Sequence, residues 1–272
     1  MVKKGNTIFG LQKISTSTIR YNPVVLHKIL PEKPMFSQQS EVSFEDISIE
    51  AFKTILNNGQ HCTSVSSIHT EQNDKSYKII LSFDDGHKSD IDIVLPMLKQ
   101  KNFKATFFIV PAFVGKKGYL DWDDIRVLSA AGMEIGSHSM THPDFRNLSY
   151  AEANSELYNS KRVIESKINV TINSFAFPFG FAPQRFLTLA QEIGYESIMG
   201  SHHGLITGPS DSILPRNSIH SRMSDKQIKN LLNTSQALKL YWFFENTTKP
   251  VLKNVLPTNI YLKLRNLLSN DR

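Results

Sequence analysis

The 272-residue sequence is poor in cysteine and in long apolar runs. Cys62 is its single cysteine, which excludes an internal disulfide and with it the class of small disulfide-stapled secreted domains. No segment approaches the roughly 20 apolar residues that a membrane-spanning helix needs. Lys3 and Lys4 near the N-terminus are not followed by an apolar run of signal-peptide length. We therefore expect a cytoplasmic protein that is at most peripheral to the inner membrane.

The composition is ordinary for a globular domain, with 40% hydrophobic and 21% charged residues. The length allows one large domain with appendages. A net charge of +6 is consistent with mild attraction to lipid headgroups, nucleotide-linked sugars or polyanionic glycans. A merely basic surface explains the charge equally well, so this feature by itself assigns no partner, and nothing in the sequence indicates nucleic acid binding.

Strand and helix patterns alternate from residue 77 onward. Apolar runs predict strands at 79–83, 105–110, 133–137, 172–177, 196–199 and 212–219. Helical spacing predicts helices at 91–100, 121–131, 150–167, 183–193 and 224–232. Upstream we expect a strand within 24–30, a helix within 43–56 capped by Ser48, and a surface loop at 60–76. This alternation predicts an α/β fold with a parallel sheet, either open or closed as a barrel.

Two adjacent carboxylates, Asp84 and Asp85, follow the apolar strand at 79–83 and precede Gly86. The C-terminal ends of parallel strands are where α/β folds place their chemistry. Burying two anions is costly unless a metal ion or a proton compensates them. The sequence therefore indicates a functional site at this strand end.

Two histidines, His138 and His142, follow the strand predicted at 133–137. Pro143 disfavours helical backbone at His142, so we expect a tight loop that turns both imidazoles inward. Two imidazoles and one carboxylate form a three-ligand set with open positions for water and substrate, as in catalytic metal sites. Zn²⁺ is the first expectation, with Co²⁺, Ni²⁺ or Fe²⁺ as alternatives. The opposing interpretation is that each side chain is satisfied separately by hydrogen bonds.

Three segments carry a resemblance to a known family. Ser82-Phe83-Asp84-Asp85-Gly86 resembles the first motif of the polysaccharide deacetylases, the family-4 carbohydrate esterases with a NodB-like homology domain. His138-Ser139-Met140-Thr141-His142 is similar to their His-Ser/Thr-x-x-His motif, and the segment 175–180 resembles their Pro-Tyr-Gly motif. The resemblance covers about residues 75–235 and implies a distorted (β/α) barrel with about seven strands, similar to a TIM barrel.

The resemblance also implies roles for individual residues. Asp85, His138 and His142 would hold the metal, and Asp84 would be the general base that acts on water. The segment Pro178, Phe179 and Gly180 would line the substrate, with a backbone N–H near Phe179 facing the oxyanion. Together these roles imply hydrolysis of an N-acetyl group on an amino sugar.

The sequence departs from the family pattern at two catalytic positions. Ala176 stands where relatives often carry an arginine that orients the catalytic aspartate, and Arg216 is the candidate replacement. No strong copy of the late motif with the general acid is present, and His220 is the nearest match. Arg216 as an ordinary tethering arginine and His220 as an incidental surface residue are the alternatives. His27 and His87 are further candidates to line the site, whereas His202 and His203 are expected to be solvated.

The predicted organisation has three parts. Residues 1–75 are an N-terminal extension packing on the barrel, 76–235 the deacetylase domain, and 236–272 a basic aromatic tail that covers the domain, touches a membrane or contacts a partner. The predicted substrate is a polysaccharide, an oligosaccharide or a lipid-linked precursor, in bacterial surface glycan biosynthesis. The alternatives are a glycan-binding module that kept the metal site but lost turnover, and a deformylase or other amide hydrolase.

Overall fold

The computed structural model describes residues 21–31, 43–58, 60–70, 77–206, 212–236, 238, 239, 242 and 246. The predicted amphipathic helix at 261–268 and most of the predicted aromatic cluster of the tail therefore lie outside the described residues. The proposed membrane contact through 236–272 depends largely on that part of the chain and stays a prediction. Among the described residues, every helix is too short or too polar to cross a membrane.

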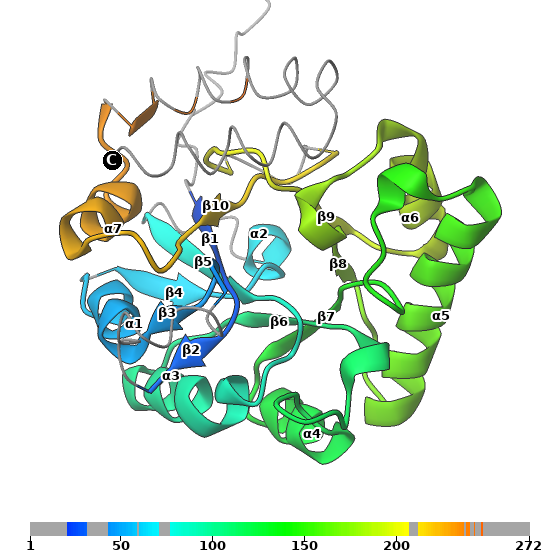
Figure 1. Ribbon diagram of the computed structural model, residues 1–272, viewed down its shortest axis with the longest axis horizontal. Helices are drawn as coiled ribbons and strands as arrows, with labels where there is room; N and C mark the ends of the chain where they lie inside the picture. The colour runs from blue at the N-terminus through cyan, green and yellow to red at the C-terminus, as the bar shows by residue number, and fades with distance from the viewer. Residues whose placement is uncertain are drawn as a thin grey trace, which may run out of the picture.

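Seven parallel strands form a curved sheet with the order β10-β1-β5-β6-β7-β8-β9 (Figure 1). Their bounds are β1 Tyr21–Leu26, β5 Lys78–Phe83, β6 Thr106–Ile109, β7 Glu134–Ser137, β8 Ser174–Ala176, β9 Ser197–Met199 and β10 Asn217–Ser218. A further strand, β4 (His61–Thr63), pairs with the first half of β5. The strands β2 (Ile29–Leu30) and β3 (Ile47–Ser48) form a separate pair.

The sheet closes on itself through the segment 214–218. Leu214 bridges to Met199 at the end of β9, and three residues later Asn217 pairs with Val24 of β1. The short segment thus joins the two edges of the sheet, which leaves each edge strand with a partner. The distorted (β/α) barrel predicted from the sequence is confirmed.

Helices other than α2 surround the sheet on its outer side (Figure 1). Their bounds are α1 Ile49–Leu56, α2 Ser67–Thr70, α3 Leu95–Lys101, α4 Trp122–Ala130, α5 Tyr150–Ile168, α6 Leu187–Ile193 and α7 Asp225–Leu232. A π-helical turn, Asp90–Val94, precedes α3, and Pro96 lies in the first turn of α3 where its missing N–H is tolerated. Ser149 caps α5 in a capping box with Glu152, as predicted, and Ser48 caps α1.

Alternation along the strands separates two hydrophobic cores. Leu81 and Phe107 belong to the large core between sheet and helices, whereas Ile80, Phe108 and Met199 belong to a small core inside the barrel. The helix α2 lies within the ring of strands in Figure 1 and adds Ile68 to this inner core. Because side chains alternate with a period of two, residues an even number of positions from the inner-core residues also face inward at the strand ends.

Several predicted elements differ from the structure. The stretch 60–76 is not a surface loop in its described part, since it contains β4 and α2. The strand expected at 212–219 is reduced to β10 because the segment serves two different neighbours. Both β1 and β4 come from the predicted N-terminal extension yet belong to the barrel sheet. Trp242, predicted to be exposed, is 4% exposed and packs into the outer core.

Candidate metal centre

Asp84 and Asp85 lie at the C-terminal end of β5, where the sequence placed them. Asp84 is four residues after Ile80, so the alternation turns its side chain into the barrel, and it is 2% exposed. The backbone then reverses through Asp85 and Gly86, which have φ values of 75° and 74°. A positive φ is uncommon outside glycine and costs free energy at Asp85. The reversal gives the two neighbouring carboxylates different directions.

His138 follows β7 and faces inward because Gly136, two residues earlier, lies against the inner-core ring of Phe108. Its Nδ1 lies 2.7 Å from the backbone oxygen of Ala176. That carbonyl only accepts, so Nδ1 carries the proton and Nε2 keeps a lone pair for a metal ion. Burial lowers the pKa of His138 to about 4, which keeps the imidazole neutral at pH 7.

The second histidine is held by a loop that the sequence predicted as tight and non-helical. Within it, Ser139 and His142 have φ values of 67° and 63°, and the His142 N–H donates to Ser139 Oγ at 3.0 Å. Glu156 of α5 accepts from the backbone N–H groups of Met140 and Thr141 at 2.8 Å each. Glu156 is not predictable from the sequence, since its role depends on where α5 packs and no local pattern marks it.

The three predicted ligands converge. One ligand atom each of Asp85, His138 and His142 lies within 4.8 Å of the other two. Asp85 Oδ1 is 3.4 Å from His142 Nε2 and 3.7 Å from His138 Nε2. Although buried, Asp85 Oδ1 accepts no hydrogen bond, which is costly without a partner. An uncompensated carboxylate oxygen beside two imidazole nitrogens fits a divalent cation, and these residues would hold it.

Arg216 lies directly on Asp84. Its Nη1 donates to both carboxylate oxygens of Asp84 at 2.7 Å, and its Nε donates to the Gly200 oxygen at 2.9 Å. Both charged side chains are buried. Ala176, at the family position of the orienting arginine, is a fully buried member of the inner core. Arg216 therefore reaches Asp84 from the closing segment of the barrel, as the sequence suggested, and not from β8.

Both aspartates have a pKa below the ordinary value, and they differ in their partners. Burial raises the pKa of Asp84, but the positive charge of Arg216, followed by His138 and His27, outweighs burial and leaves that pKa below its ordinary value. Since His138 is neutral at pH 7, its contribution is small beside that of Arg216, which stays charged. Asp84 is therefore an ionised carboxylate that is already paired, whereas Asp85 has an oxygen left for a metal.

The turn Pro178–Gly180 follows β8 and carries Phe179 with φ 56°. The hydrogen bonds of the turn itself use the N–H groups of Gly180 and Phe181 and not that of Phe179. At Gly180, with φ 65°, an added Cβ would lie 2.0 Å from Ser201 Cβ, so only glycine fits. Phe179 is 58% exposed, and its ring centroid lies 4.7 Å from that of His142.

His27, His87 and His220 are placed less directly. His87 Nε2 lies 3.7 Å from Asp85 Oδ2. His27 directly follows β1 and exerts an electrostatic influence on both Asp84 and Asp85. His220 follows β10, and its ring stacks on Phe44 at 4.1 Å between centroids. The structure thus places His87 beside Asp85, His27 at the end of the strand next to β5, and the His220 ring against Phe44.

Asp90 is a buried carboxyl that sequence analysis did not single out. It is 0% exposed, and neither of its side-chain oxygens has a hydrogen-bond partner. Burial, followed by the charges of Asp85 and Asp84, raises the pKa of Asp90 well above its ordinary value. A neutral acid is the form that such surroundings favour. A π-helical turn is often found at functional sites, and Asp90 opens this one.

Metal binding gives a first prediction. Zn²⁺ at 100 times its Kd is expected to stabilise the folded chain by about 2.7 kcal/mol, because the ion binds only the folded arrangement. Asp85→Ala is expected to remove this stabilisation. Thermal unfolding with and without Zn²⁺ measures both. Asp92→Ala, which removes an exposed carboxylate of the following turn, is the matched control, and Zn²⁺ should raise its unfolding temperature as much as that of the unaltered chain. If Zn²⁺ raises the unfolding temperature of Asp85→Ala by the same amount, the proposed ligand set is wrong.

Comparison with known proteins finds similar sequences in one family. A family model described as polysaccharide deacetylase matches residues 71–198. A chitooligosaccharide deacetylase of Bradyrhizobium sp. is 30% identical over 122 residues, which are 44% of this chain and 54% of the relative. A peptidoglycan-N-acetylglucosamine deacetylase of Bacillus cereus is 29% identical over 126 residues, 46% of this chain and 57% of the relative. The chain spans between about a quarter and three fifths of the length of these and similar curated relatives.

Solved structures show the same fold. The Streptococcus pyogenes deacetylase PplD in complex with acetate superposes with a TM-score of 0.70 at 19% identity, covering 79% of this chain and 99% of that one. A polysaccharide deacetylase from Bacillus cereus gives a TM-score of 0.67 at 18% identity and covers 79% of this chain and 69% of that one. At such identities the likeness concerns the barrel alone.

Proposed function

Through residues 71–198 this chain belongs to the polysaccharide deacetylase family, and on that premise we propose that it hydrolyses the N-acetyl group of an amino sugar in a glycan. The observation that carries the proposal is that Asp84 and Asp85 have different partners. One carboxylate is ionised and held by Arg216, and its neighbour joins two imidazoles in a three-ligand cluster.

The proposed reaction consumes one water molecule. A divalent cation held by Asp85, His138 and His142 would supply Lewis acidity to the acetyl oxygen and to water. Asp84 takes a proton from the water whose oxygen forms a bond to the carbonyl carbon. The N–H of Phe179 faces the oxygen on which negative charge develops. The C–N bond then breaks, a proton passes to the sugar nitrogen, and acetate and a free amine are the products.

The proton donor to the leaving amine is an imidazole in this proposal. His220 is the residue that the sequence favours, and His27 is the second candidate, because it directly follows β1 where Leu26 pairs with Phe83, next to the aspartates. Loss of a general acid typically costs 10²- to 10⁴-fold, so substitution of the true donor is expected to lower kcat by about 10²-fold. Comparison of His220→Asn with His27→Asn over a range of pH measures this. An unchanged kcat in His220→Asn removes the predicted role from that residue.

The rim of the site supports a sugar as substrate. Phe179 and Phe113 lie against His142, with ring centroids 4.7 and 5.9 Å away. Tyr119 stacks on His87 at 4.9 Å and contacts Phe113 at 5.0 Å. These rings form a continuous aromatic wall beside the proposed metal ligands. Aromatic rings provide large apolar faces on which ligand rings pack, and the apolar face of a pyranose suits this wall.

The aromatic wall yields a second prediction. Phe179→Ala is expected to raise KM for a chitooligosaccharide by about fivefold with a smaller change in kcat, because stacking at an exposed ring contributes on the order of 1 kcal/mol in substrate and transition state alike. Steady-state kinetics measure the split. Tyr158→Ala removes an exposed ring of similar size on the outer helix α5 and should leave KM unchanged. A similar rise in both variants contradicts a role for the wall.

Acetate release from chitooligosaccharides and from nucleotide-linked amino sugars, measured together with bound metal, tests the function as a whole. Zn²⁺ is the first choice in our proposal, because imidazole and carboxylate ligands suit it. A bacterial surface glycan or its lipid-linked precursor is the proposed substrate class. The alternative of a glycan-binding module without turnover depended in part on the missing motif arginine at Ala176. Arg216 contacts Asp84 instead, so this argument against turnover is weaker. Formate in place of acetate among the products would favour the deformylase alternative.

A further inference from the structure

The segment 200–204, here called the supporting limb, leaves β9 and runs beside the residues that precede β10. The Gly200 N–H donates to the Leu214 oxygen at 2.9 Å, and the Arg216 N–H donates to the His202 oxygen at 3.0 Å. The side chain of Arg216 also contacts the limb, through Nε and the Gly200 oxygen at 2.9 Å. The limb therefore fixes both the backbone and the guanidinium of the residue that holds Asp84.

Two residues near the C-terminus, Trp242 and Asn246, contact the other side of this limb. Asn246 accepts from the His203 N–H at 3.1 Å and donates from Nδ2 to the His203 oxygen at 2.6 Å. The amide side chain of Asn246 thus bonds both the N–H and the C=O of one residue. Trp242 lies parallel to the His203 ring, with centroids 6.2 Å apart and planes inclined by 9°. His203, predicted to be solvated, is thus a docking point for the C-terminal segment.

A chain of asparagines continues this contact into the barrel. Asn217, next to Arg216, accepts from the Gly204 N–H at 3.1 Å and donates to the Gly204 oxygen at 2.9 Å. Its Nδ2 also donates to Asn22 Oδ1 of β1 at 2.7 Å, and Asn22 donates to the Leu231 oxygen of α7 at 2.8 Å. The limb is consequently clamped between β10 on one side and the C-terminal segment on the other.

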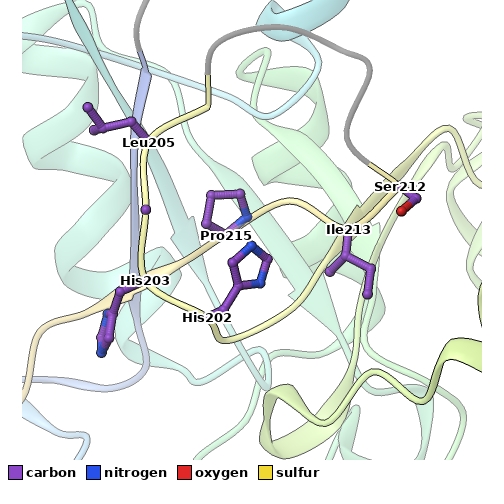
Figure 2. A pocket seen from close by; sticks show the side chains of 7 residues that line it. His202, His203, Leu205, Ser212, Ile213 and Pro215 are labelled. Carbon is purple, nitrogen blue, oxygen red and sulfur yellow. The ribbon is translucent and has the colours of Figure 1, made fainter. Parts of the chain in front are cut away.

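A cavity borders the limb. Its volume is about 450 Å³, and its lining consists of His202, His203, Gly204, Leu205, Ser212, Ile213 and Pro215. Figure 2 shows the His202 ring beside Pro215 and the His203 ring turned to the opposite side of the limb. On the cavity side the limb is held by its backbone hydrogen bonds to Leu214 and Arg216. The contacts of Asn246 and Trp242 with His203 hold its opposite side.

We propose that Trp242 and Asn246 are positioning residues that hold Arg216 against Asp84 by way of the supporting limb. The proposal rests on the proposed deacetylase function and assigns Trp242 and Asn246, which lie beyond the matched family region, to the catalytic unit. Loosening the clamp shifts the limb, the Gly200 oxygen and the guanidinium together. The metal ligands are carried by the ends of β5 and β7 and stay in place.

Asn246→Ala tests the proposal through kinetics and a double-mutant cycle. We expect kcat to fall about tenfold, with KM and bound Zn²⁺ unchanged, because small displacements of a catalytic group are costly. In an Arg216→Ala background the same substitution should have no further effect, since both act through one contact. Asn246→Asp, of the same size, loses the donor and repeats the test if the alanine variant folds poorly. If Asn246→Ala lowers kcat by the same factor in the unaltered chain and in the Arg216→Ala background, the proposal is overturned.

Two further measurements separate this inference from the deacetylase assignment. Asn233→Ala removes another asparagine that bridges elements, to Asn58 and Gln60 at 3.3 Å, and should leave kcat unchanged. Hydrogen exchange of the Arg216 Nε–H, followed by NMR, should become faster in Asn246→Ala and not in Asn233→Ala, whether or not acetate is released. Unchanged exchange in Asn246→Ala overturns the positioning role, and absent acetate release by the unaltered chain overturns the proposed function.

Discussion

Asp84→Asn is expected to lower kcat by about 10³-fold while the chain keeps its divalent metal. General-base catalysis typically contributes 10²- to 10⁴-fold, and an amide of the same size cannot take a proton from water. Asp84 accepts two hydrogen bonds from Arg216 and is 2% exposed, so the substitution changes charge without opening a cavity. Acetate release from a chitooligosaccharide, together with metal analysis, measures both parts of the expectation.

Asp92→Asn provides the comparison for this result. It removes an exposed carboxylate seven residues after Asp85 and should leave turnover and metal content unchanged. If Asp84→Asn loses its metal instead, Asp84 is a ligand and the division between the two aspartates is wrong. If it turns over as fast as the unaltered chain, a different group is the base.

Arg216→Ala is expected to lower kcat by about 10²-fold and to shift the acid limb of the pH profile upward. The direction follows from the two opposing influences on Asp84. Burial raises the pKa of this carboxyl, and Arg216 is the first of the charges that lower it. Without the guanidinium the pKa rises, so the ionised base is lost at a higher pH as the solution is acidified. Rate measurements across the acid range reveal the shift.

The same substitution is expected to destabilise the fold, because removal of one partner from a buried ion pair costs about 3 to 5 kcal/mol. Below the pKa of the unpaired Asp84 this difference should shrink, since a protonated carboxyl no longer lacks a counter-charge. Urea denaturation at two pH values measures this difference in stability.

Ala176→Arg in the Arg216→Ala background places a guanidinium on the inner face of β8 and should restore part of the activity. Ala176→Lys is its matched comparison. An unshifted acid limb in Arg216→Ala contradicts the electrostatic role.

Much of the barrel could be predicted from local pattern. Alternating strands and helices between residues 77 and 199 appear within a few residues of their expected bounds, because apolar periodicity and caps such as Ser149 act over one or two turns. The same reasoning missed β4 and α2, whose short polar sequences resemble a loop. Their structure depends on neighbours, since β4 pairs with β5 and Ile68 fills the inner core.

The candidate site divides in the same way. Asp85, His138 and His142 could be identified from sequence, because each lies at or just after the end of a strand and strand ends meet on one face of a parallel barrel. Glu156 and Asp90 could not, since an acidic residue on a helix usually faces water. Whether such a side chain holds a loop or is buried without a partner depends on packing between elements.

The sequence by itself determined the strand ends, the ligand types and the absence of an arginine at Ala176. Only the tertiary structure decided what holds Asp84, because Arg216 is 132 residues away along the chain. Their contact requires the barrel to close through 214–218 with the correct alternation, and closure depends on the tilt and register of all strands together. The clamp of Asn246 on His203 has the same origin. Local periodicity specifies which way each side chain faces on its own strand, and the closed sheet determines which of these side chains meet.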